Sequence, residues 1–255
     1  MAKIIILGTA NAVSAENNEN THLLIQNGGR VILVDCVGSP VPRLARAGVQ
    51  LDQVTDLLLT HFHPDHVSAT PLLLMDMWLV GRTEPLTVHG LAHTIIRMQT
   101  MMDLYDWKQW PGFFPVKFNI LPESETIPVI KGNDFQISAA PVKHLVPTIG
   151  IRVDFLTNHL SAVYSSDTEP CDAVIRLAKD TDILIHEASG ESTGHSSARQ
   201  AGEIAHAAGA KSLYLIHYPP QADNETLTHE AQETYAGPVI IAQDFMEISL
   251  NMRVG

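Results

Sequence analysis

The sequence predicts an α/β protein built as a four-layer αββα sandwich, in which two β-sheets face each other and helices cover their outer faces. Short apolar segments typical of buried strands alternate along the chain with longer segments typical of helices. Strands come first in each half of the chain and helices follow, so the two halves resemble each other in kind. Two sheets that face each other bury their inner faces, and helices then cover the outer ones.

The first half of the chain contains five expected strands and two expected helices. The segment 57–60 is short and apolar and ends in polar residues, as a buried strand does. The segment 67–80 is apolar nearly all round, which predicts either a deeply buried helix or a helix that contacts a second subunit. The expected elements are strands at 3–7, 23–26, 31–35, 57–60 and 86–88, and helices at 67–80 and 92–106.

The second half of the chain is predicted to form six more strands and one long helix. Ser197 and Gln200 have the spacing of a capping box, so we expect this helix to begin at Ser197. The two apolar strands nearest to it flank it in the sequence. The expected elements are strands at 116–121, 135–140, 149–155, 162–165, 183–186 and 213–217, and a helix at 197–208.

Composition narrows the class of protein. The 255 residues, of which 45% are apolar, fit a single large domain, expected to span residues 1–255. No apolar run reaches the roughly 18 residues of a membrane-spanning helix, the N-terminal segment does not resemble a signal peptide, and two cysteines make no disulfide framework. We therefore expect a cytoplasmic protein without a membrane partner. The net charge of −12 disfavours a protein that holds long nucleic acids by their backbone.

The segment THFHPDHVSA, residues 60–69, predicts a metal site. In the extended part, His61 and His63 point to the same side because side chains alternate along a strand. Pro64 ends the extension and favours the start of a helix, where Asp65 and His66 face back toward the same point. One strand-to-helix turn can therefore present two pairs of ligands to two adjacent metals. Imidazole and carboxylate ligands without thiolate suit Zn²⁺ or Mn²⁺ and, less often, iron.

Further motifs give this chain a resemblance to the metallo-β-lactamase superfamily. Besides THFHPDH, they are the opening LGT, Asp35 in ILVDC, His144 in PVKH, Asp167 in YSSDT and His217 in LYLIHY. The resemblance covers nearly the whole chain and implies the αββα fold. It also implies two metal ions per chain, with zinc favoured and manganese as the alternative. One ion would be held by His61, His63 and His144, the other by Asp65, His66 and His217, and Asp167 would bridge them.

The implied chemistry is hydrolysis by a hydroxide shared between two metal ions. Asp65 is a candidate to orient that hydroxide, and is thus a candidate catalytic residue as well as a ligand. We interpret Asp35 as the hydrogen-bond acceptor of a ligand imidazole. A strand-end aspartate that only begins a turn is the alternative.

The segment 186–217 narrows the resemblance to ribonuclease Z and its relatives, which carry the motifs H-E-A-T and G-H-S-T before a helix. The resemblance implies that His195, on a loop expected to be mobile because of Gly190 and Gly194, stabilises charge on the phosphate or protonates the leaving oxygen. His186 and Glu187 match the neighbouring motif, and we expect them to form hydrogen bonds around His195 rather than to bind metal.

Departures from ribonuclease Z bear on the substrate. The short interval between His144 and Asp167 leaves no room for the long arm that grips tRNA in that enzyme. The motifs read HEAS and GHSS here, residues 36–42 replace a GEGTQ-like stretch, and the segment ANAVSAENNEN carries no arginine. These losses argue against tRNA as the substrate, but they do not affect the prediction of phosphodiesterase chemistry.

The sequence therefore predicts a di-metal hydrolase, resembling the phosphodiesterase branch, that cleaves phosphodiesters of small molecules or nucleotides. A tRNA 3′-processing endonuclease and a hydrolase of lactones or of carboxylic or sulfuric esters are the alternatives. A homodimer is possible. The segment 98–115, dense in Met and aromatic residues, is either a lid over the metals or part of the core. Six histidines match no motif: His22, His89, His93, His159, His206 and His229.

Overall fold

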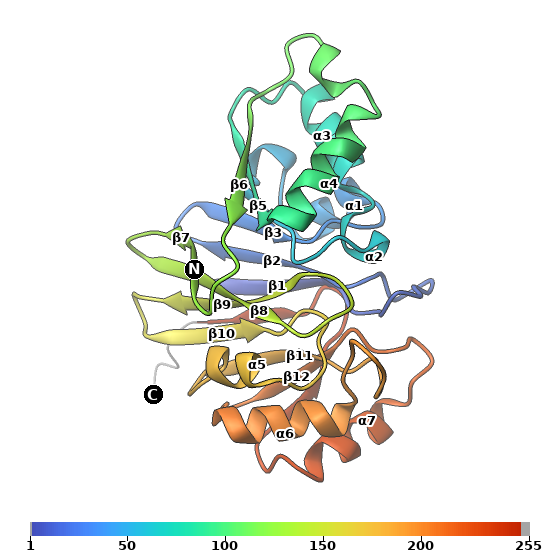
Figure 1. The fold of residues 1–255 in the computed structure, drawn as a ribbon, viewed down its shortest axis with the longest axis vertical. Coiled ribbons are helices and arrows are strands. Elements are labelled where there is room, and N and C mark those ends of the chain that lie inside the picture. The colour runs from blue at the N-terminus through green and yellow to red at the C-terminus, as the bar shows by residue number, and fades with distance from the viewer. Residues whose placement is uncertain (1, 251–255) are drawn as a thin grey trace.

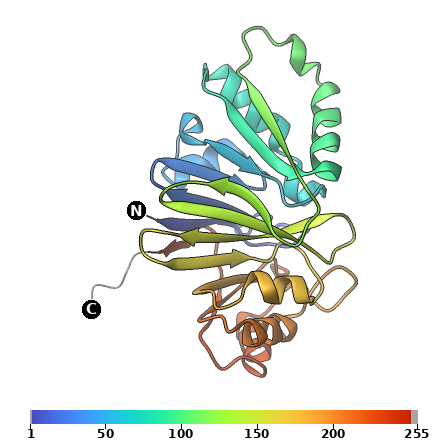
Figure 2. The ribbon, with the colours of Figure 1, turned by 60° about the vertical axis from the view of Figure 1, so that its left-hand side comes forward.

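Two seven-stranded sheets form the centre of the protein, whose computed structural model describes residues 2–250. The first sheet has the strand order β14-β1-β2-β3-β4-β5-β6 and the second β13-β12-β11-β10-β9-β8-β7. Helices α1, α3 and α4 cover the outer face of the first sheet, and α5, α6 and α7 cover that of the second (Figures 1 and 2). The expected four-layer αββα sandwich is confirmed.

The first sheet carries the helices of the N-terminal half. Its strands are β1 Lys3–Gly8, β2 His22–Asn27, β3 Arg30–Val34, β4 Asp56–Leu58, β5 Leu86–Leu91, β6 Val116–Leu121 and β14 Glu247–Ser249. Its helices are α1 Pro40–Arg46, α2 Pro64–Val67, α3 Thr70–Leu79 and α4 Ala92–Asp103, with short 3₁₀ turns at Leu51–Gln53 and Trp107–Gln109.

The second sheet and its helices come from the remaining chain. Its strands are β7 Ile127–Lys131, β8 Phe135–Val142, β9 Thr148–Phe155, β10 Leu160–Tyr164, β11 Ile183–Glu187, β12 Leu213–Ile216 and β13 Val239–Ile241. Its helices are α5 Asp172–Leu177, α6 Ala198–Ala208 and α7 Asn224–Gln232. Helix α6 begins as expected, because a capping box forms. The Gln200 amide donates to the Ser197 hydroxyl oxygen, and the Ser197 amide donates to the Gln200 side-chain oxygen.

Strand periodicity divides the core into its layers. In β1, Ile4 and Ile6 face the space between the sheets, whereas Ile5 and Leu7 face the helices of the first half. All four side chains are at most 2% exposed, since both faces of the sheet are covered. A strand that is buried on both faces has apolar residues at every position. This is why the apolar segment IIIL at residues 4–7 predicts a strand although its polarity does not alternate.

The structure corrects several expected elements. Strand β6 does not open the second half but pairs in parallel with β5 at the edge of the first sheet. The expected helix at 67–80 is broken between α2 and α3, because Pro71 can occupy only the first turn of a new helix. Helices α1, α5 and α7 and strands β7, β13 and β14 were not expected. They are short elements at which periodicity is weak.

The two apolar segments left open by the sequence each contain both buried and exposed apolar side chains. Leu73, Leu74 and Met77 of α3 are fully buried on the helix side of the first sheet, whereas Leu79 is 63% exposed. In the segment 98–115, Met98 and Met102 are fully buried in the same cluster, whereas Leu104 and Tyr105 are 80% and 57% exposed, so only part of the segment belongs to the core. No helix within residues 2–250 is long and apolar enough to cross a membrane.

Candidate metal centre

The parallel strands of the two sheets end at one edge of the sandwich, and polar side chains gather there. Strands β3 and β4 run parallel in the first sheet, as do β10, β11 and β12 in the second. The carboxyl ends of parallel strands meet at one edge, which is where open α/β sheets place their ligands. The predicted residues lie at or shortly after the ends of these strands: Asp35 after β3, His61 to His66 after β4, Asp167 after β10 and His217 after β12, with Glu187 ending β11.

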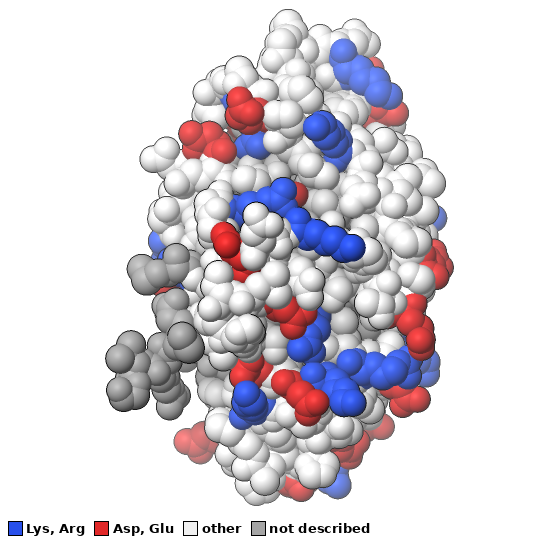
Figure 3. Space-filling model, turned by 90° about the vertical axis from the view of Figure 1, so that its left-hand side faces the viewer, with Lys and Arg blue, Asp and Glu red and all other residues white. Residues whose placement is uncertain are grey.

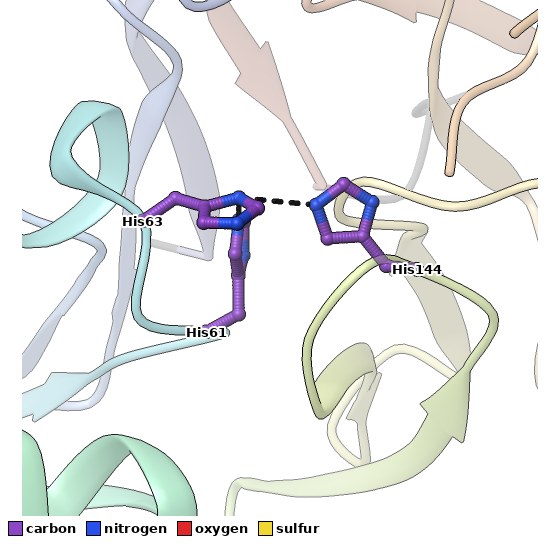
Figure 4. A group of neighbouring side chains, drawn as sticks. All are labelled: His61, His63 and His144. Atoms are coloured by element: carbon purple, nitrogen blue, oxygen red, sulfur yellow. Dashed lines mark hydrogen bonds between the residues drawn. The ribbon is translucent and has the colours of Figure 1, made fainter. Parts of the chain in front are cut away.

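Three histidines from both halves of the chain form the first group (Figure 4). His61 Nε2 lies 3.1 Å from His63 Nδ1, and His144 Nε2 lies 3.1 Å from the same His63 nitrogen. His61 and His63 come from the segment after β4 and His144 from the segment after β8, so the three rings approach one point from opposite sheets. The predicted first ligand set is thus brought together.

The second group contains Asp65, His66, Asp167 and His217. One Asp65 oxygen lies 3.6 Å from Nε2 of both His66 and His217. Asp167 lies between the two groups. Its Oδ1 is 3.4 Å from His66 Nε2, and its Oδ2 is 3.5 Å from His217 Nε2 and 3.9 Å from His61 Nε2 and from His144 Nε2. One carboxylate thus contacts both groups, as expected of a bridging ligand.

The donor atoms of this cluster fit divalent metal ions. His66 Nε2, His217 Nε2 and Asp167 Oδ1 are buried and have no hydrogen-bond partner among the described residues, and leaving buried polar atoms unpaired costs free energy. A zinc ion bound to ligands at about 2.0–2.1 Å in tetrahedral geometry holds neighbouring donor atoms about 3.3 Å apart. The separations of 3.1–3.9 Å in both groups match this spacing. Divalent metal binding follows from this geometry and chemistry.

Hydrogen bonds behind the rings fix which nitrogen faces the centre. His66 Nδ1 lies 2.8 Å from Asp35 Oδ2, which leaves Nε2 free to face the cluster. The same carboxylate accepts hydrogen bonds from the backbone and hydroxyl of Thr60. His144 Nδ1 lies 2.6 Å from the Gly194 carbonyl oxygen, so its Nε2 also faces inward. Asp35 thus occupies the position expected of it, and Thr60 and the Gly194 carbonyl are partners that the sequence did not indicate.

Unusual backbone conformations accompany these positions. Asp35, Ser166 and His217 have φ values of 60°, 55° and 54°, in the left-handed region that non-glycine residues seldom adopt. Each lies where a strand ends at the cluster, and each such conformation costs on the order of 1–3 kcal/mol. Strained backbone positions that gather at one place are typical of a functional site.

His195 lies beside both groups and is held by Glu187. Its Nδ1 is 3.0 Å from Glu187 Oε1, and its ring centroid lies 5.0 Å from that of His144 and 5.7 Å from that of His217. Glu187 is fully buried and also accepts hydrogen bonds from the Thr168 and Ser189 backbones. Its orientation is therefore fixed from three sides, and His195 Nε2 is left free to act.

The surroundings of Asp167 and His195 shift the pKa values of both side chains. Burial alone would raise the pKa of Asp167, but the surrounding imidazoles, His217 and His66 first, hold it well below the usual range, so this carboxylate is ionised. The hydrogen bond with Glu187 raises the pKa of His195, against burial, which lowers it. His195 is therefore more often protonated near neutral pH than a free histidine is.

One expectation around His195 needs correction. His186 does not join the hydrogen bonds of His195. Successive side chains of β11 point to opposite faces, so the His186 ring lies on the other side of the strand from Glu187, where its Nδ1 pairs with the Glu187 carbonyl oxygen. Gly194 has a packing role that the sequence did not indicate, because a Cβ there would lie 2.9 Å from His144 Nδ1. Its amide also donates to Glu169.

The fold and this cluster define the class of protein. A four-layer αββα sandwich with a histidine and aspartate cluster at the strand ends is that of the metallo-β-lactamase superfamily, and the chain is a metal-dependent hydrolase of its ribonuclease Z-like branch. More narrowly, residues 2–236 match the family model described as Anti-Pycsar protein Apyc1. The chain therefore belongs to that family.

Curated relatives and solved structures agree with this assignment. Ribonuclease Z of Methanothermobacter thermautotrophicus is 26% identical over 305 aligned residues, which cover 98% of this chain and 97% of the relative. Ribonuclease Z of Mycobacterium sp. strain KMS is 29% identical, over 93% of this chain and 92% of the relative.

Among solved structures, the metallo-β-lactamase fold protein YhfI of Bacillus subtilis superimposes with a TM-score of 0.83 at 23% identity, covering 97% of this chain and 98% of that one. Human tRNase Z, short form, gives a TM-score of 0.77 at 21% identity, covering 98% and 100%. A diphosphatase from the PhnP family gives 0.75 at 17% identity, covering 98% of each chain.

Proposed function

We propose that this protein hydrolyses phosphodiester bonds of small molecules or nucleotides with two divalent metal ions, zinc first and manganese as the alternative. The observation that carries the proposal is the position of His195, held by a buried glutamate beside the predicted metal ligands. A protonated imidazole at that place can stabilise charge on a phosphate and protonate its leaving oxygen. Hydrolysis of a lactone or a carboxylic ester at the same metals does not need such a group.

Each ion would be held by one group of side chains. His61, His63 and His144 would hold one ion, Asp65, His66 and His217 the other, and Asp167 would contact both. When bound, the two ions supply positive charge for the phosphate oxygens and a nucleophilic hydroxide at neutral pH. Asp35 and the Gly194 carbonyl accept the Nδ1 protons of His66 and His144, so Nε2 is the nitrogen of each ring that would bind a metal ion.

The chain's own residues would then orient the reaction. Asp65 is 14% exposed and lies at the edge of the cluster, where its carboxylate can accept a hydrogen bond from the attacking water. His195 would donate its proton from Nε2 to the leaving oxygen. Glu187 would stabilise the imidazolium through Nδ1 and keep the ring in place.

Two features support a small substrate. Strands β9 and β10 fill the interval between His144 and Asp167, the interval in which ribonuclease Z carries the arm that grips tRNA. The net charge is −12, and the face in Figure 3 shows basic and acidic side chains interspersed over a largely uncharged surface. A long RNA is held by several basic contacts to its phosphates.

The second candidate is tRNA 3′-end processing. It is favoured by the curated relatives, which are named Ribonuclease Z and align over nearly the full chain. The same metal groups and the same His195 would serve that reaction, so the two candidates differ in how the substrate is held rather than in how it is cut.

Salt dependence separates these candidates. The purified metal-loaded protein is assayed against bis(p-nitrophenyl) phosphate, cyclic nucleotides, precursor tRNA, lactones and aryl sulfates. We expect kcat/KM for small phosphodiesters to depend weakly on salt and precursor tRNA to be cut poorly. Each phosphate contact on a single strand contributes roughly −0.7 to the log–log slope of affinity against salt. Efficient, site-specific cleavage of precursor tRNA with a steep slope would overturn the proposal, as would preferential hydrolysis of lactones or sulfates.

We further propose a cytoplasmic homodimer of single-domain chains. Both cysteines are free, which fits a reducing compartment. Helices α3 and α4 carry exposed apolar side chains, among them Leu72, Leu79 and Ile96, which a second copy would cover. Sedimentation of Leu79→Glu against the unchanged protein tests the dimer, because a charge in a buried apolar contact would dissociate it.

A further inference from the structure

A polar cavity of about 440 Å³ lies apart from the metal cluster. It is bordered by the loop at residues 16–18, helix α1, the segment 218–224 that leads into α7, and the turn at residues 243–245. None of the predicted metal ligands lines it. Its volume lies within the range of ligand sites in proteins, roughly 300–1,000 Å³.

Two arginines of helix α1 share one aromatic ring at this cavity. Arg43 and Arg46 are three positions apart and therefore project from the same side of the helix. Their guanidinium carbons lie 4.6 Å and 3.8 Å from the centroid of the Phe245 ring. Two cations on one helix face repel each other unless anions neutralise them, and the electron-rich face of a phenyl ring offsets only part of this repulsion.

The turn that supplies Phe245 is strained. Phe245 has a φ of 68°, which for a bulky residue costs on the order of 1–3 kcal/mol. Its amide donates to the Ile6 carbonyl at 2.6 Å, and the next amide, of Met246, donates to the Gln243 carbonyl at 3.0 Å. The fold thus holds the Phe245 ring against the two arginines in spite of this cost.

Only one of the two arginines is neutralised. Arg43 pairs with Asp244 and also donates to the Leu7 carbonyl. Asp244 is engaged by three donors, because it also accepts hydrogen bonds from the Thr9 hydroxyl at 2.7 Å and the Glu19 amide at 3.0 Å. Within residues 2–250, no carboxylate lies within ion-pair distance of Arg46. In a chain of net charge −12, this leaves one guanidinium at the cavity without an anion.

The remaining lining indicates which kind of ligand the cavity fits. Side-chain amides of Asn17, Asn224 and Gln243 border the cavity and can both donate and accept hydrogen bonds. A planar guanidinium presents two parallel N–H groups to a phosphate or carboxylate. We propose that this cavity binds a phosphate monoester of nucleotide size, whose phosphate pairs with Arg46 and whose sugar and base meet the amides. Glu16 also lines the cavity, and its charge disfavours ligands with a second anionic group near it.

The site is independent of the reaction at the metal cluster, so its test uses the full chain with metals removed by chelation. Titration calorimetry is carried out with adenosine 5′-monophosphate, inorganic phosphate and adenosine. We expect the monophosphate to bind, phosphate to bind more weakly because it lacks the contacts to the amides, and adenosine not to bind. Arg46→Gln should lower the affinity for the monophosphate at least tenfold, since it removes a charge-assisted hydrogen bond.

Two further variants make the result specific. Arg176→Gln makes the same charge change at an exposed position on α5 and should leave the affinity unchanged. Phe245→Leu removes the ring beneath Arg46 and should weaken binding several-fold, with the thermal midpoint showing that the variant is folded. Equal affinity in the Arg46→Gln variant and the unchanged protein would overturn the proposal. So would the absence of binding, or binding that appears only when metal is restored, since the ligand would then occupy the metal cluster.

Discussion

Replacing Glu187 by glutamine tests the assignment of His195 more sharply than removing the histidine itself. The substitution keeps the size of the side chain but removes the charge that faces His195 Nδ1 at 3.0 Å. A hydrogen bond to a charged group contributes about 1.5–3 kcal/mol. If that free energy stabilises the imidazolium in the transition state, kcat should fall about 10- to 150-fold. His195→Ala removes the proton donor and should lower kcat about 10²- to 10⁴-fold.

The assay compares two leaving groups. The p-nitrophenolate leaving group needs no proton, whereas an alkyl or ribose alkoxide does, so both variants should lose far more activity on the second kind of substrate. Metal content should not change, because neither residue belongs to the predicted ligand groups. Glu191→Gln is the matched control, since Glu191 is exposed in the same loop.

The pH profile gives a second readout. The hydrogen bond with Glu187 raises the pKa of His195, so the protonated form, and with it kcat, is present at low pH and is lost as the pH rises through that raised value. Glu187→Gln should move this loss to lower pH. Equal losses on both leaving groups, together with an unmoved profile, would refute acid catalysis by His195. A fall in metal content in His195→Ala would make His195 a metal ligand instead.

Two further predictions follow from the geometry. Elemental analysis should find about two metal ions per chain. Asp167→Ala should lose most of the metal and all activity, because Asp167 contacts both groups. Full metal content in that variant would contradict the bridging role. Asp56→Asn should lower the free energy of unfolding at pH 7 by about 1–3 kcal/mol, because Asp56 pairs with the buried His89. Burial acts to raise the pKa of Asp56, but the hydrogen bonds from His89 and Thr55 outweigh burial and lower the pKa. The stabilisation by ionised Asp56 is therefore present above about pH 4 and is lost as the pH falls below that value. Urea unfolding at pH 7 and pH 3 should therefore show the difference between variant and unchanged protein narrowing at pH 3.

The sequence predicted the layered fold and, together with the family resemblance of its motifs, the residues that gather at the strand ends. The apolar strand 4–7 and the motif H-x-H-x-D-H carry their information locally, in the period of side chains along a strand and in the break that Pro64 imposes. His144, Asp167 and His217 were added through the resemblance of their motifs to the metallo-β-lactamase superfamily, and the structure places all three at the cluster. The single-domain prediction and the catalytic roles stay predictions.

Tertiary structure decided what depends on contacts between distant segments. The placement of β6 in the first sheet depends on its pairing with β5, and the break between α2 and α3 depends on how Pro71 enters a new helix. His186 and Glu187 are neighbours in one motif, yet the pleat of β11 sends them to opposite faces, and only Glu187 contacts His195. The cavity at Arg46 could not be predicted, because its four segments are far apart in the chain. That Arg46 has no carboxylate within ion-pair distance among the described residues is likewise visible only in the folded chain.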